Sequence, residues 1–367
     1  MQRMATRRNI LAGIGTAAVF GGAGYWALGG PSYDQAVDAD WAPMLPAASS
    51  DLEYLVHFAI HAANGHNTQS WTFTRSGGDV VIAPDFSRRT PIVDPDDHHL
   101  FASLGCAAEN LALAAAAEGQ SASIGFDDVV DGQVRIGLAK GPAERNPWFD
   151  AILKRQCTRS DYDGRAIPAD DLRTLEDAAA IEGCRVVLLS ERPKMDQLGA
   201  LIVAANTVQV EDPDFVAELQ SWLRFNARSA IASGDGLYAA CSGNPTLPSW
   251  LAPTVFRMVF SAKSENDKCT RQVRSSSGLA VFLAEKDDKE HWVKAGQSYQ
   301  RFALQATAMG MKHAFLNQPT EVPNFRSDLL GLVGATEPRP NLLVRFGYGD
   351  PMPRSLRRPV SAVIVPS

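Results

Sequence analysis

"LGCAAENLALAAAAEGQ" (residues 104–120) and "AGQSYQRFALQATAMGM" (residues 295–311) align without a gap. Both stretches are rich in small and apolar residues, and Gly105 and Gly296 occupy the same place near their starts. We expect each stretch to be a helix that ends at a later glycine, because glycine readily adopts the left-handed conformation that closes a helix. Ala-rich helices can resemble one another through composition alone, so this pair needs support from its surroundings.

That support comes from a strand expected after each helix, at "QVRIGLA" (133–139) and "LLVRFGYG" (342–349). Two matching elements in the same order favour two related halves, joined near residues 141–146. The sequence therefore predicts three parts, which are an N-terminal segment over 1–30, a first repeat over 31–145 and a second repeat over 146–367.

Local patterns place further elements in both halves. The apolar spacing of "DLEYLVHFAIHAANG" predicts a helix over 51–65, and the strands "SWTFTR" and "DVVIAP" flank a Gly77-Gly78 hairpin signal. In the second half, helices are expected at "NPWFDAILKR" and "IPADDL", and strands at "CRVVLLS" and "GLAVFLAE". Between those two strands lies a mostly helical insertion, about residues 192–275, with no counterpart in the first half.

Composition excludes some classes of protein. The chain has 367 residues, of which 45% are hydrophobic and 21% charged, as in an ordinary globular protein. Its formal charge of −6 argues against a nucleic-acid partner, because phosphate binding needs a basic surface. The five cysteines form no CxxC pair, so we expect neither a disulfide framework nor a zinc site.

The first thirty residues have the pattern of a targeting segment. Arg7 and Arg8 precede an apolar stretch rich in Gly and Ala that carries no charge until Asp34. This pattern favours a twin-arginine export signal, and so an exported, periplasmic protein that meets the twin-arginine machinery. The alternative is a membrane anchor through residues 10–30, which approach the length needed to span a bilayer.

A loop with many neutral hydrogen-bonding groups, "HAANGHNTQSWTF" (61–73), follows the first helix. A flavin ring presents alternating donors and acceptors around a planar apolar body. The side chains of Asn67 and Gln69 each offer both a donor and an acceptor, so they match that edge. The alternative is a polar turn capped by Asn, with Trp71 starting a strand.

The same loop resembles the flavin-contacting segment of the nitroreductase family, since "AANGHNTQSW" keeps Asn67, Gln69 and Trp71 at that family's spacing. It departs from the family where Ala63, Asn64 and Ser70 replace the usual Pro, Ser and Pro. The stretches 84–119 and 152–172, and the C-terminal "GDPMPRSLRRP", are similar to the Acg-type branch, in which two nitroreductase-like repeats are fused.

This resemblance implies an α+β nitroreductase-like fold in which two fused repeats mimic the family homodimer, with mixed or antiparallel sheets wrapped by helices. It also implies the cofactor FMN, a monomer with an internal pseudo-dimer, and arginines that contact the flavin phosphate. No side-chain acid or base is assigned to catalysis. The predicted FMN-binding residues are His66, Asn67, Thr68, Gln69, Arg155, Thr158, Arg159, Arg357 and Arg358.

Two rival interpretations concern metals and turnover. His57 and His61 lie four residues apart, but no HExxH pattern accompanies them, so we expect no metal site. The insertion could instead close over the flavin and leave a flavin-sequestering protein in place of an oxidoreductase. In the oxidoreductase interpretation a nitro-aromatic, a quinone or a similar small molecule is the electron acceptor, and the donor stays open. Because the phosphate arginines fall in one half and the amide loop in the other, we expect one flavin per chain.

Overall fold

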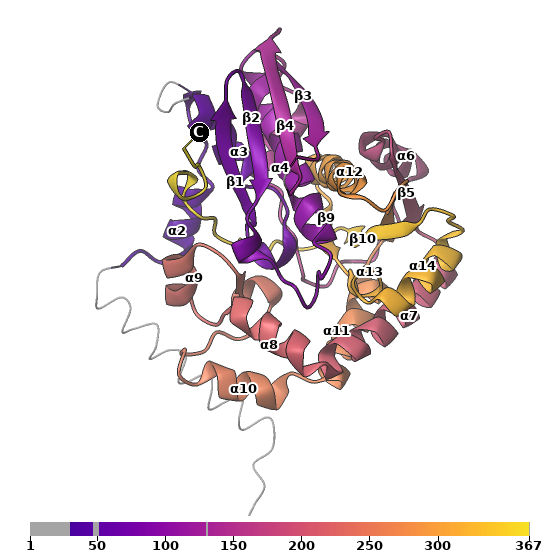
Figure 1. Cartoon of the computed structure of the whole chain (residues 1–367). Coiled ribbons are helices and arrows are strands. Elements are labelled where there is room, and N and C mark those ends of the chain that lie inside the picture. Colours follow the sequence, from indigo (N-terminus) through magenta and orange to yellow (C-terminus); the bar gives the residue numbers. More distant parts are fainter. Residues whose placement is uncertain (1–29, 47–50, 130, 367) are drawn as a thin grey trace, which may run out of the picture.

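Two four-stranded antiparallel sheets, wrapped by helices, form the body of the molecule in the computed structural model, which describes residues 30–46, 51–129 and 131–366 (Figure 1). The α+β class predicted from the sequence is confirmed. The first sheet contains β1 (Trp71–Ser76), β2 (Asp79–Pro84), β4 (Gln133–Lys140) and β3 (Gln120–Asp127), and the second contains β5 (Cys184–Leu189), β8 (Gly278–Ala284), β10 (Arg339–Gly347) and β9 (Lys312–Phe315).

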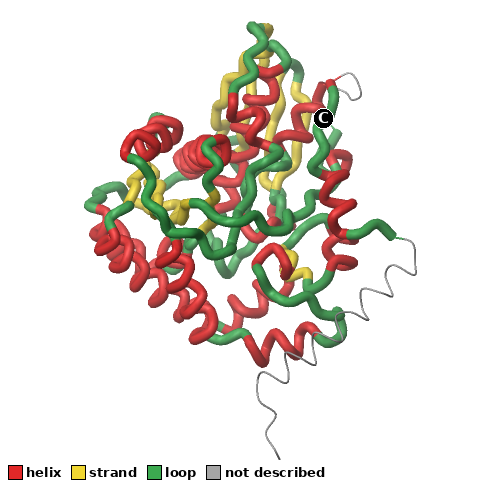
Figure 2. Tube along the Cα trace, turned by 180° about the vertical axis from the view of Figure 1, so that it is seen from behind, coloured by secondary structure: helices red, strands yellow, loops and turns green. Residues whose placement is uncertain are grey.

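Helices outnumber strands in the described part of the chain (Figure 2). The α-helices are α2 (Tyr33–Asp40), α3 (Asp51–Ala59), α4 (His98–Ala117), α5 (Pro147–Ile152), α6 (Ala169–Ala179), α7 (Arg192–Glu211), α8 (Pro213–Trp222), α9 (Ala227–Ser233), α10 (Ala252–Val259), α11 (Ala262–Ser275), α12 (Lys289–Ala308), α13 (Gln318–Glu321) and α14 (Arg326–Val333). Short 3-10 helices are η2 (Gly65–Asn67), η3 (Phe86–Arg88), η4 (Ala239–Ser242), η5 (Pro323–Phe325) and η6 (Val360–Ala362).

The two sheets have equivalent strand orders. The first runs β1-β2-β4-β3 and the second β5-β8-β10-β9, so in each sheet the third strand of the chain lies at the edge beside the fourth. The predicted hairpin is present, with Ser76 paired to Asp79 across Gly77-Gly78. The two strands that the sequence matched to each other, β4 and β10, occupy the same position in their sheets.

Helices α4 and α12 pack closely along their matched glycines. A Cβ atom at Gly105 would lie 2.0 Å from the backbone oxygen of Val293, and one at Gly296 would lie 1.8 Å from that of Ala102. Ala102 and Val293 each stand three residues before the glycine of their own helix. The contact is therefore reciprocal, as at a two-fold interface between identical subunits.

We call this contact between α4 and α12 the seam. Polar pairs at the seam are reciprocal as well. Arg301 Nε donates to Glu109 Oε1 at 2.8 Å, and Gln300 Nε2 donates to Asn110 Oδ1 at 2.7 Å. Glu109 and Gln300 each lie four residues after the glycine of their helix, and Asn110 and Arg301 lie five residues after it. A pseudo-two-fold axis thus passes between α4 and α12.

The hydrophobic core covers both faces of the second sheet. In β8, Ala280 and Phe282 pack against the central helices, whereas Val281 and Leu283, which alternate with them, pack with α7 and α11 of the insertion. Alternation of this kind is the period of a strand buried on both faces. In the first sheet, β3 alternates between half-buried and exposed residues, so its outer face meets solvent. Helix α4 is long and apolar enough to span a membrane, but 83% of its most apolar window is buried inside the molecule, as expected of a core helix.

The insertion between β5 and β8 is mostly helical, as predicted, and contains α7 to α11 and the two-stranded parallel pair β6 (Leu223–Arg224) and β7 (Leu237–Tyr238). It extends below both sheets in Figure 1. The predicted export signal lies outside the described residues apart from Gly30.

The helix predicted over 51–65 is shorter than expected, because α3 ends at Ala59. Two guanidinium groups take the carbonyl oxygens beyond its end. Arg357 Nε donates to Ile60 O at 2.8 Å, and Arg155 Nη2 donates to His61 O at 3.0 Å. Cations at a helix C-terminus satisfy its unpaired carbonyls and interact favourably with its dipole.

Candidate functional site

The loop after α3 has a strained backbone. His66, Asn67 and Gln69 have φ values of 47°, 54° and 54°, in the left-handed region that L-residues with side chains seldom adopt. Such strain persists only where surrounding contacts fix it, and it is common at functional sites. One of these contacts is internal, since the Gln69 N–H donates to Asn64 Oδ1 at 3.0 Å.

The amide side chains predicted to contact a flavin bind the protein itself. Asn67 Nδ2 donates to the carbonyl oxygens of Gly236 and Leu356, each at 3.0 Å. Gln69 Nε2 donates to Gly234 O at 2.9 Å. The loop therefore fastens the insertion and the C-terminal segment to the first half, and a role of these two amides in cofactor binding stays a prediction.

Their acceptor oxygens and the hydroxyl between them are also engaged. Asn67 Oδ1 accepts from Arg357 Nη1 at 2.8 Å, and Gln69 Oε1 accepts from the Arg358 N–H at 2.8 Å. Thr68 Oγ1 lies 2.7 Å from Ser70 Oγ.

The predicted phosphate arginines fall into two groups. Arg155 and Arg357 are buried, bind backbone carbonyls near the end of α3, and lie close enough to repel each other. Burial lowers the pKa of Arg357 to about 10, and the charge of Arg155 acts in the same direction. Arg358 donates to Gln69 O and Ala362 O, and Thr158 is buried with its N–H on His313 O at 2.9 Å.

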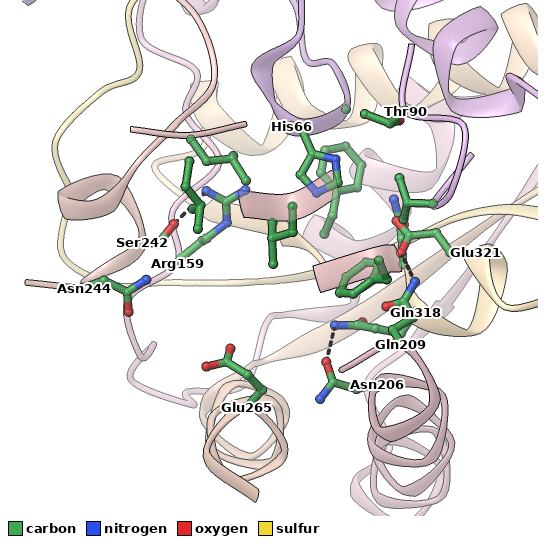
Figure 3. Close-up of a pocket in the computed structure, with 18 of the residues that line it drawn as sticks. His66, Thr90, Arg159, Asn206, Gln209, Ser242, Asn244, Glu265, Gln318 and Glu321 are labelled. Atoms are coloured by element: carbon green, nitrogen blue, oxygen red, sulfur yellow. Dashed lines mark hydrogen bonds between the residues drawn. The ribbon is translucent and has the colours of Figure 1, made fainter. Parts of the chain in front are cut away.

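Arg159 and His66 instead line a cavity of about 370 Å³ between the two halves and the insertion (Figure 3). This volume is within the range of cofactor and small-molecule sites. The first half contributes residues 63–66 and one face of α4, namely His99, Ala102, Ser103 and Cys106. The second half contributes Tyr299, Phe315 and Leu342, and the insertion contributes an apolar wall that includes Phe215, Leu219, Phe225, Leu247, Phe256 and Phe260.

One end of the cavity is cationic. Arg159 Nη1 donates to Ser242 Oγ at 3.3 Å, and Lys268 Nζ donates to Ser242 O at 3.4 Å. Burial lowers the pKa of Lys268, Glu265 opposes this, and the nearby charge of Arg159 adds to it. Two cations held by one residue, Ser242, form a binding point for an anionic group. Sequence reasoning identified Arg159 but missed Lys268, which stands in the insertion without a recognisable motif.

His66 lies in the cavity wall, between this cationic end and the opposite end. Burial lowers the pKa of His66 to about 4, with the Arg159 charge acting in the same direction, so this imidazole is neutral at pH 7. The opposite end is lined by the amides of Asn206, Gln209 and Gln318 and by the carboxyl group of Glu321, none of which the sequence singled out (Figure 3).

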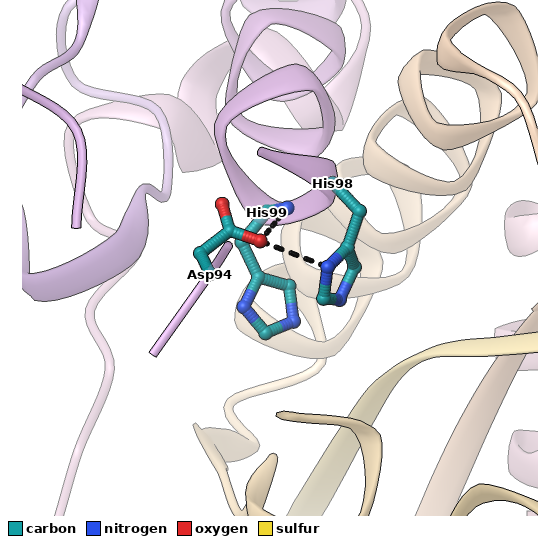
Figure 4. A group of neighbouring side chains, drawn as sticks. All are labelled: Asp94, His98 and His99. Atoms are coloured by element: carbon teal, nitrogen blue, oxygen red, sulfur yellow. Dashed lines mark hydrogen bonds and ion pairs between the residues drawn. The ribbon is translucent and has the colours of Figure 1, made fainter. Parts of the chain in front are cut away.

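Asp94, His98 and His99 bring possible metal-ligating atoms within 4.8 Å of one another beside this cavity (Figure 4). However, His98 Nδ1 already contacts Asp94 Oδ1 at 2.8 Å and Arg339 Nη2 at 2.8 Å. The Asp94 oxygens also accept the N–H groups of His99 and Leu100 at the start of α4. A guanidinium so close to the imidazole would repel a metal cation, so we interpret this cluster as an ion-pair network that caps the helix.

Comparison with known proteins adds sequence relatives. No protein-family model matches the chain. The chain is 25% identical, over 327 residues, to "Putative NAD(P)H nitroreductase Rv3131" of Mycobacterium tuberculosis strain H37Rv, and the match covers 83% of this chain and 88% of the relative. A protein of the strain CDC 1551, "Putative NAD(P)H nitroreductase MT3217", matches with the same figures.

Solved structures give partial matches. The FMN-dependent nitroreductase NfnB from Mycobacterium smegmatis, in complex with NADPH, is 13% identical and covers 56% of this chain and 88% of its own, with a TM-score of 0.37. A nitroreductase with bound FMN from Desulfitobacterium hafniense is 13% identical and covers 57% of this chain and 93% of its own, also with a TM-score of 0.37. Over most of its length the chain is thus similar to bacterial proteins that carry the name nitroreductase.

Proposed function

We propose that this chain is an FMN-binding oxidoreductase of the nitroreductase family, which passes electrons to a quinone, a nitro-aromatic or a similar acceptor. The observation that carries the proposal is the cavity of about 370 Å³ that lies between the two halves, with an apolar aromatic wall and a cationic end. The sequence similarity to mycobacterial proteins named as nitroreductases supports it.

The residues of the cavity fit the chemistry of FMN. A planar apolar ring system needs aromatic and small residues around it, and Ala63, Gly65 and Ala102 leave room beside the phenylalanines of the insertion. A phosphate needs charge-assisted donors, which Arg159 and Lys268 supply. When bound, FMN would supply hydride chemistry, and the protein would orient it and exclude water.

A flavin-binding experiment tests this proposal. The full chain should bind FMN and give the absorbance spectrum of a flavoprotein. Arg159→Ala should weaken FMN binding by about 1.5–3 kcal/mol, the contribution of a hydrogen bond to a charged group, and leave riboflavin binding unchanged because riboflavin lacks the phosphate. Equal losses for FMN and riboflavin would exclude Arg159 as the phosphate contact, and a colourless protein that binds neither would refute the proposal.

Arg357→Ala provides a contrast. Because Arg357 binds Ile60 O and Asn67 Oδ1, its loss should lower the stability of the fold. We expect FMN and riboflavin binding to fall together in this variant. A selective loss of FMN would instead move the phosphate to the Arg155–Arg357 group, as the sequence resemblance implies.

A flavin-sequestering protein is the second candidate, and the attachment of the insertion favours it. Glu218 of α8 accepts the N–H groups of Ile92 and Val93 at 2.9 and 3.0 Å, and Asp235 pairs with Arg88 and Arg224. These contacts hold the insertion over the cavity. Bound flavin that is bleached within seconds by NADPH would support the oxidoreductase, whereas flavin reduced only by dithionite would support sequestration.

The remaining parts of the proposal concern origin, assembly and location. We infer that the two halves arose by fusion of nitroreductase-like repeats, because the two sheets have equivalent strand orders and the α4–α12 contacts are reciprocal. A fused pair would use its dimer surface internally, so light scattering should report a monomer. We also propose export through the twin-arginine route, which fractionation of the expressing cells would test.

A further inference from the structure

The cavity has a carboxyl group at the end opposite Arg159. Glu321 is the last residue of the short helix α13, and its side chain is only 16% exposed. Figure 3 shows it on the far side of His66 from Arg159, with Gln209 directed toward it. The identity and protonation of this group therefore affect whatever binds between the two ends.

The contacts of the Glu321 carboxyl group are compatible with a proton on its Oε1 atom. Gln209 Nε2 donates to Glu321 Oε2 at 2.7 Å, and the other oxygen, Oε1, lies 3.8 Å from His99 Nδ1. His99 Nε2 lies 3.1 Å from Asn341 O, and because a carbonyl oxygen can only accept, Nε2 must carry the ring hydrogen. His99 Nδ1 is then an acceptor, so Glu321 Oε1 faces a lone pair of this ring.

The surrounding charges agree with this assignment. Burial raises the pKa of Glu321 to about 7, opposed by the Gln209 hydrogen bond and the charge of His98, and reinforced by the negative charges of Asp94 and Glu218. These groups come from α7, α4, the loop before α4, and α8. Glu321 thus carries its proton for part of the time at neutral pH.

His99 does not compete for that proton. Burial lowers the pKa of His99 to about 3, and the charge of His98 acts in the same direction. The imidazole therefore stays neutral across the range in which Glu321 titrates.

The wall that the insertion contributes to this cavity is apolar. The rings of Phe256 and Phe260 of the insertion are stacked with their centroids 4.6 Å apart, and the ring centroid of Phe225 lies 6.0 Å from that of Phe256. All three line the cavity. Such a wall favours a neutral aromatic molecule, and the Glu321 carboxyl group lines the same cavity as a possible source of a proton.

We propose that Glu321 donates the proton that a quinone-class acceptor requires when it is reduced in this cavity. This rests on the proposed function. Bound FMN in its reduced form would supply two electrons and one proton as a hydride and would be left oxidised. The O–H bond of Glu321 breaks as a new O–H bond forms on the acceptor oxygen. The products are a hydroquinone and the Glu321 carboxylate, which Gln209 stabilises by its hydrogen bond until water returns a proton.

A single-turnover experiment separates proton donation from electron transfer. The full chain is loaded with FMN, reduced without oxygen by one equivalent of dithionite, and mixed with benzoquinone or with ferricyanide while flavin absorbance is followed. Benzoquinone needs a proton and ferricyanide does not. Glu321→Gln keeps the size of the side chain but cannot donate this proton, so we expect oxidation by benzoquinone to slow by about 10²–10⁴-fold. Oxidation by ferricyanide should keep its wild-type rate.

The matched control is Glu265→Gln, which makes the same chemical change on a carboxyl group that lines the cavity from α11. Its ratio of benzoquinone to ferricyanide rates should equal that of the wild type. If Glu321→Gln slows both oxidants equally, or neither, the proposal is overturned.

A second measurement needs no flavin. In the full chain labelled with ¹³C at glutamate carboxyl groups, the resonance that Glu321→Gln removes should titrate near pH 7. A midpoint near the ordinary value of 4.5 would overturn the proposal whatever the flavin result. A midpoint near 7 in a chain that binds no flavin would overturn the proposed function, and the donor role with it, while the buried acid would stand.

Discussion

The strand pairs β1–β2 and β5–β8 occupy the same position in their sheets, yet their connections differ. In the first half the connection is Gly77-Gly78, and in the second it is residues 190–277, which contain five α-helices within the described chain. Both pairs are antiparallel and in register, so a large change at this connection leaves the sheet intact. Long connections at a surface are tolerated because their closing entropy grows slowly with length.

The long connection, which only the second half has, forms part of the cavity wall. The insertion supplies the aromatic wall and Lys268, and the first half supplies the strained loop with His66. The seam between α4 and α12 is reciprocal, whereas the cavity also includes the insertion and the loop of His66, each of which occurs in one half only. We call the two sheets with α4 and α12 the symmetric region, and this region carries the fold. The insertion and the loop of His66 form the asymmetric region, which carries the proposed chemistry.

Substitution at the seam should break the symmetric region. Gly105→Ala would place a Cβ atom 2.0 Å from the Val293 backbone oxygen, so the two helices would have to separate. We expect the free energy of unfolding to fall by about 3 kcal/mol, the upper end for overpacking. Chemical denaturation of the full chain measures this.

The reciprocal contact sharpens that prediction. Gly296→Ala should cost a similar amount, and the double variant should cost less than the sum, because one separation of the helices relieves both clashes. Gly331→Ala is the control, since Gly331 lies within α14 with open space around it, and it should stabilise the protein by about 0.5–1 kcal/mol. Strict additivity at the seam would contradict a shared contact.

The asymmetric region should show its buried acid in the pH dependence of stability. The folded pKa of Glu321 is raised to about 7 from 4.5, so between these values the native state binds more protons than the unfolded chain. The contribution of Glu321 to stability therefore decreases as pH rises from about 4.5 to 7.

Glu321→Gln removes this dependence. The difference in unfolding free energy between variant and wild type should shift by up to about 3 kcal/mol in favour of the variant between pH 4.5 and pH 8. Denaturation curves at the two pH values measure the shift. A difference independent of pH would mean that the carboxyl group ionises normally in the fold.

The attachment of the insertion should respond to Asp235→Asn. Burial alone would raise the pKa of Asp235, but hydrogen bonds from Arg224 and Arg88 outweigh it and lower the pKa. The carboxylate therefore stabilises the fold above its ordinary pKa of 3.8, and this contribution is lost as pH falls below that value. At pH 7 its removal should cost about 1–3 kcal/mol locally.

Hydrogen exchange would show this loss at the Gly236 amide, which donates to Asn67 O at 3.0 Å. Its exchange should accelerate by roughly tenfold or more, as a local opening cost reduced by about 1.4 kcal/mol requires. Asp150→Asn is the control, because Asp150 forms an exposed pair with Arg145 and should leave Gly236 unchanged. Unchanged exchange in Asp235→Asn would show that Glu218 and the amides of Asn67 and Gln69 hold the insertion without the ion pairs of Asp235.

The elements of the symmetric region were predictable because their signals are local. The hairpin, the two long helices and the matched strands follow from glycine positions and apolar periods that stand in the sequence itself. The end of α3 was not predictable, because its stop depends on Arg155 and Arg357, which are far away in the chain.

The candidate site was predicted less completely. Asn67 and Gln69 were singled out for their amide chemistry, but their partners Gly236 and Gly234 lie in an insertion whose docking leaves no pattern in the sequence. Lys268 and Glu321 are single charged residues without a motif around them. Only their position at the cavity identifies them as candidate site residues. Long-range burial of this kind is a property of the tertiary structure.

The central claim is that one asymmetric cavity, built from both halves and the insertion, holds one FMN per chain. Titration of flavin-free full chain with FMN, followed by flavin fluorescence, tests it most directly. The account predicts saturation at one equivalent, with weaker binding in Arg159→Ala. A second equivalent of similar affinity, or no saturable binding, would contradict it.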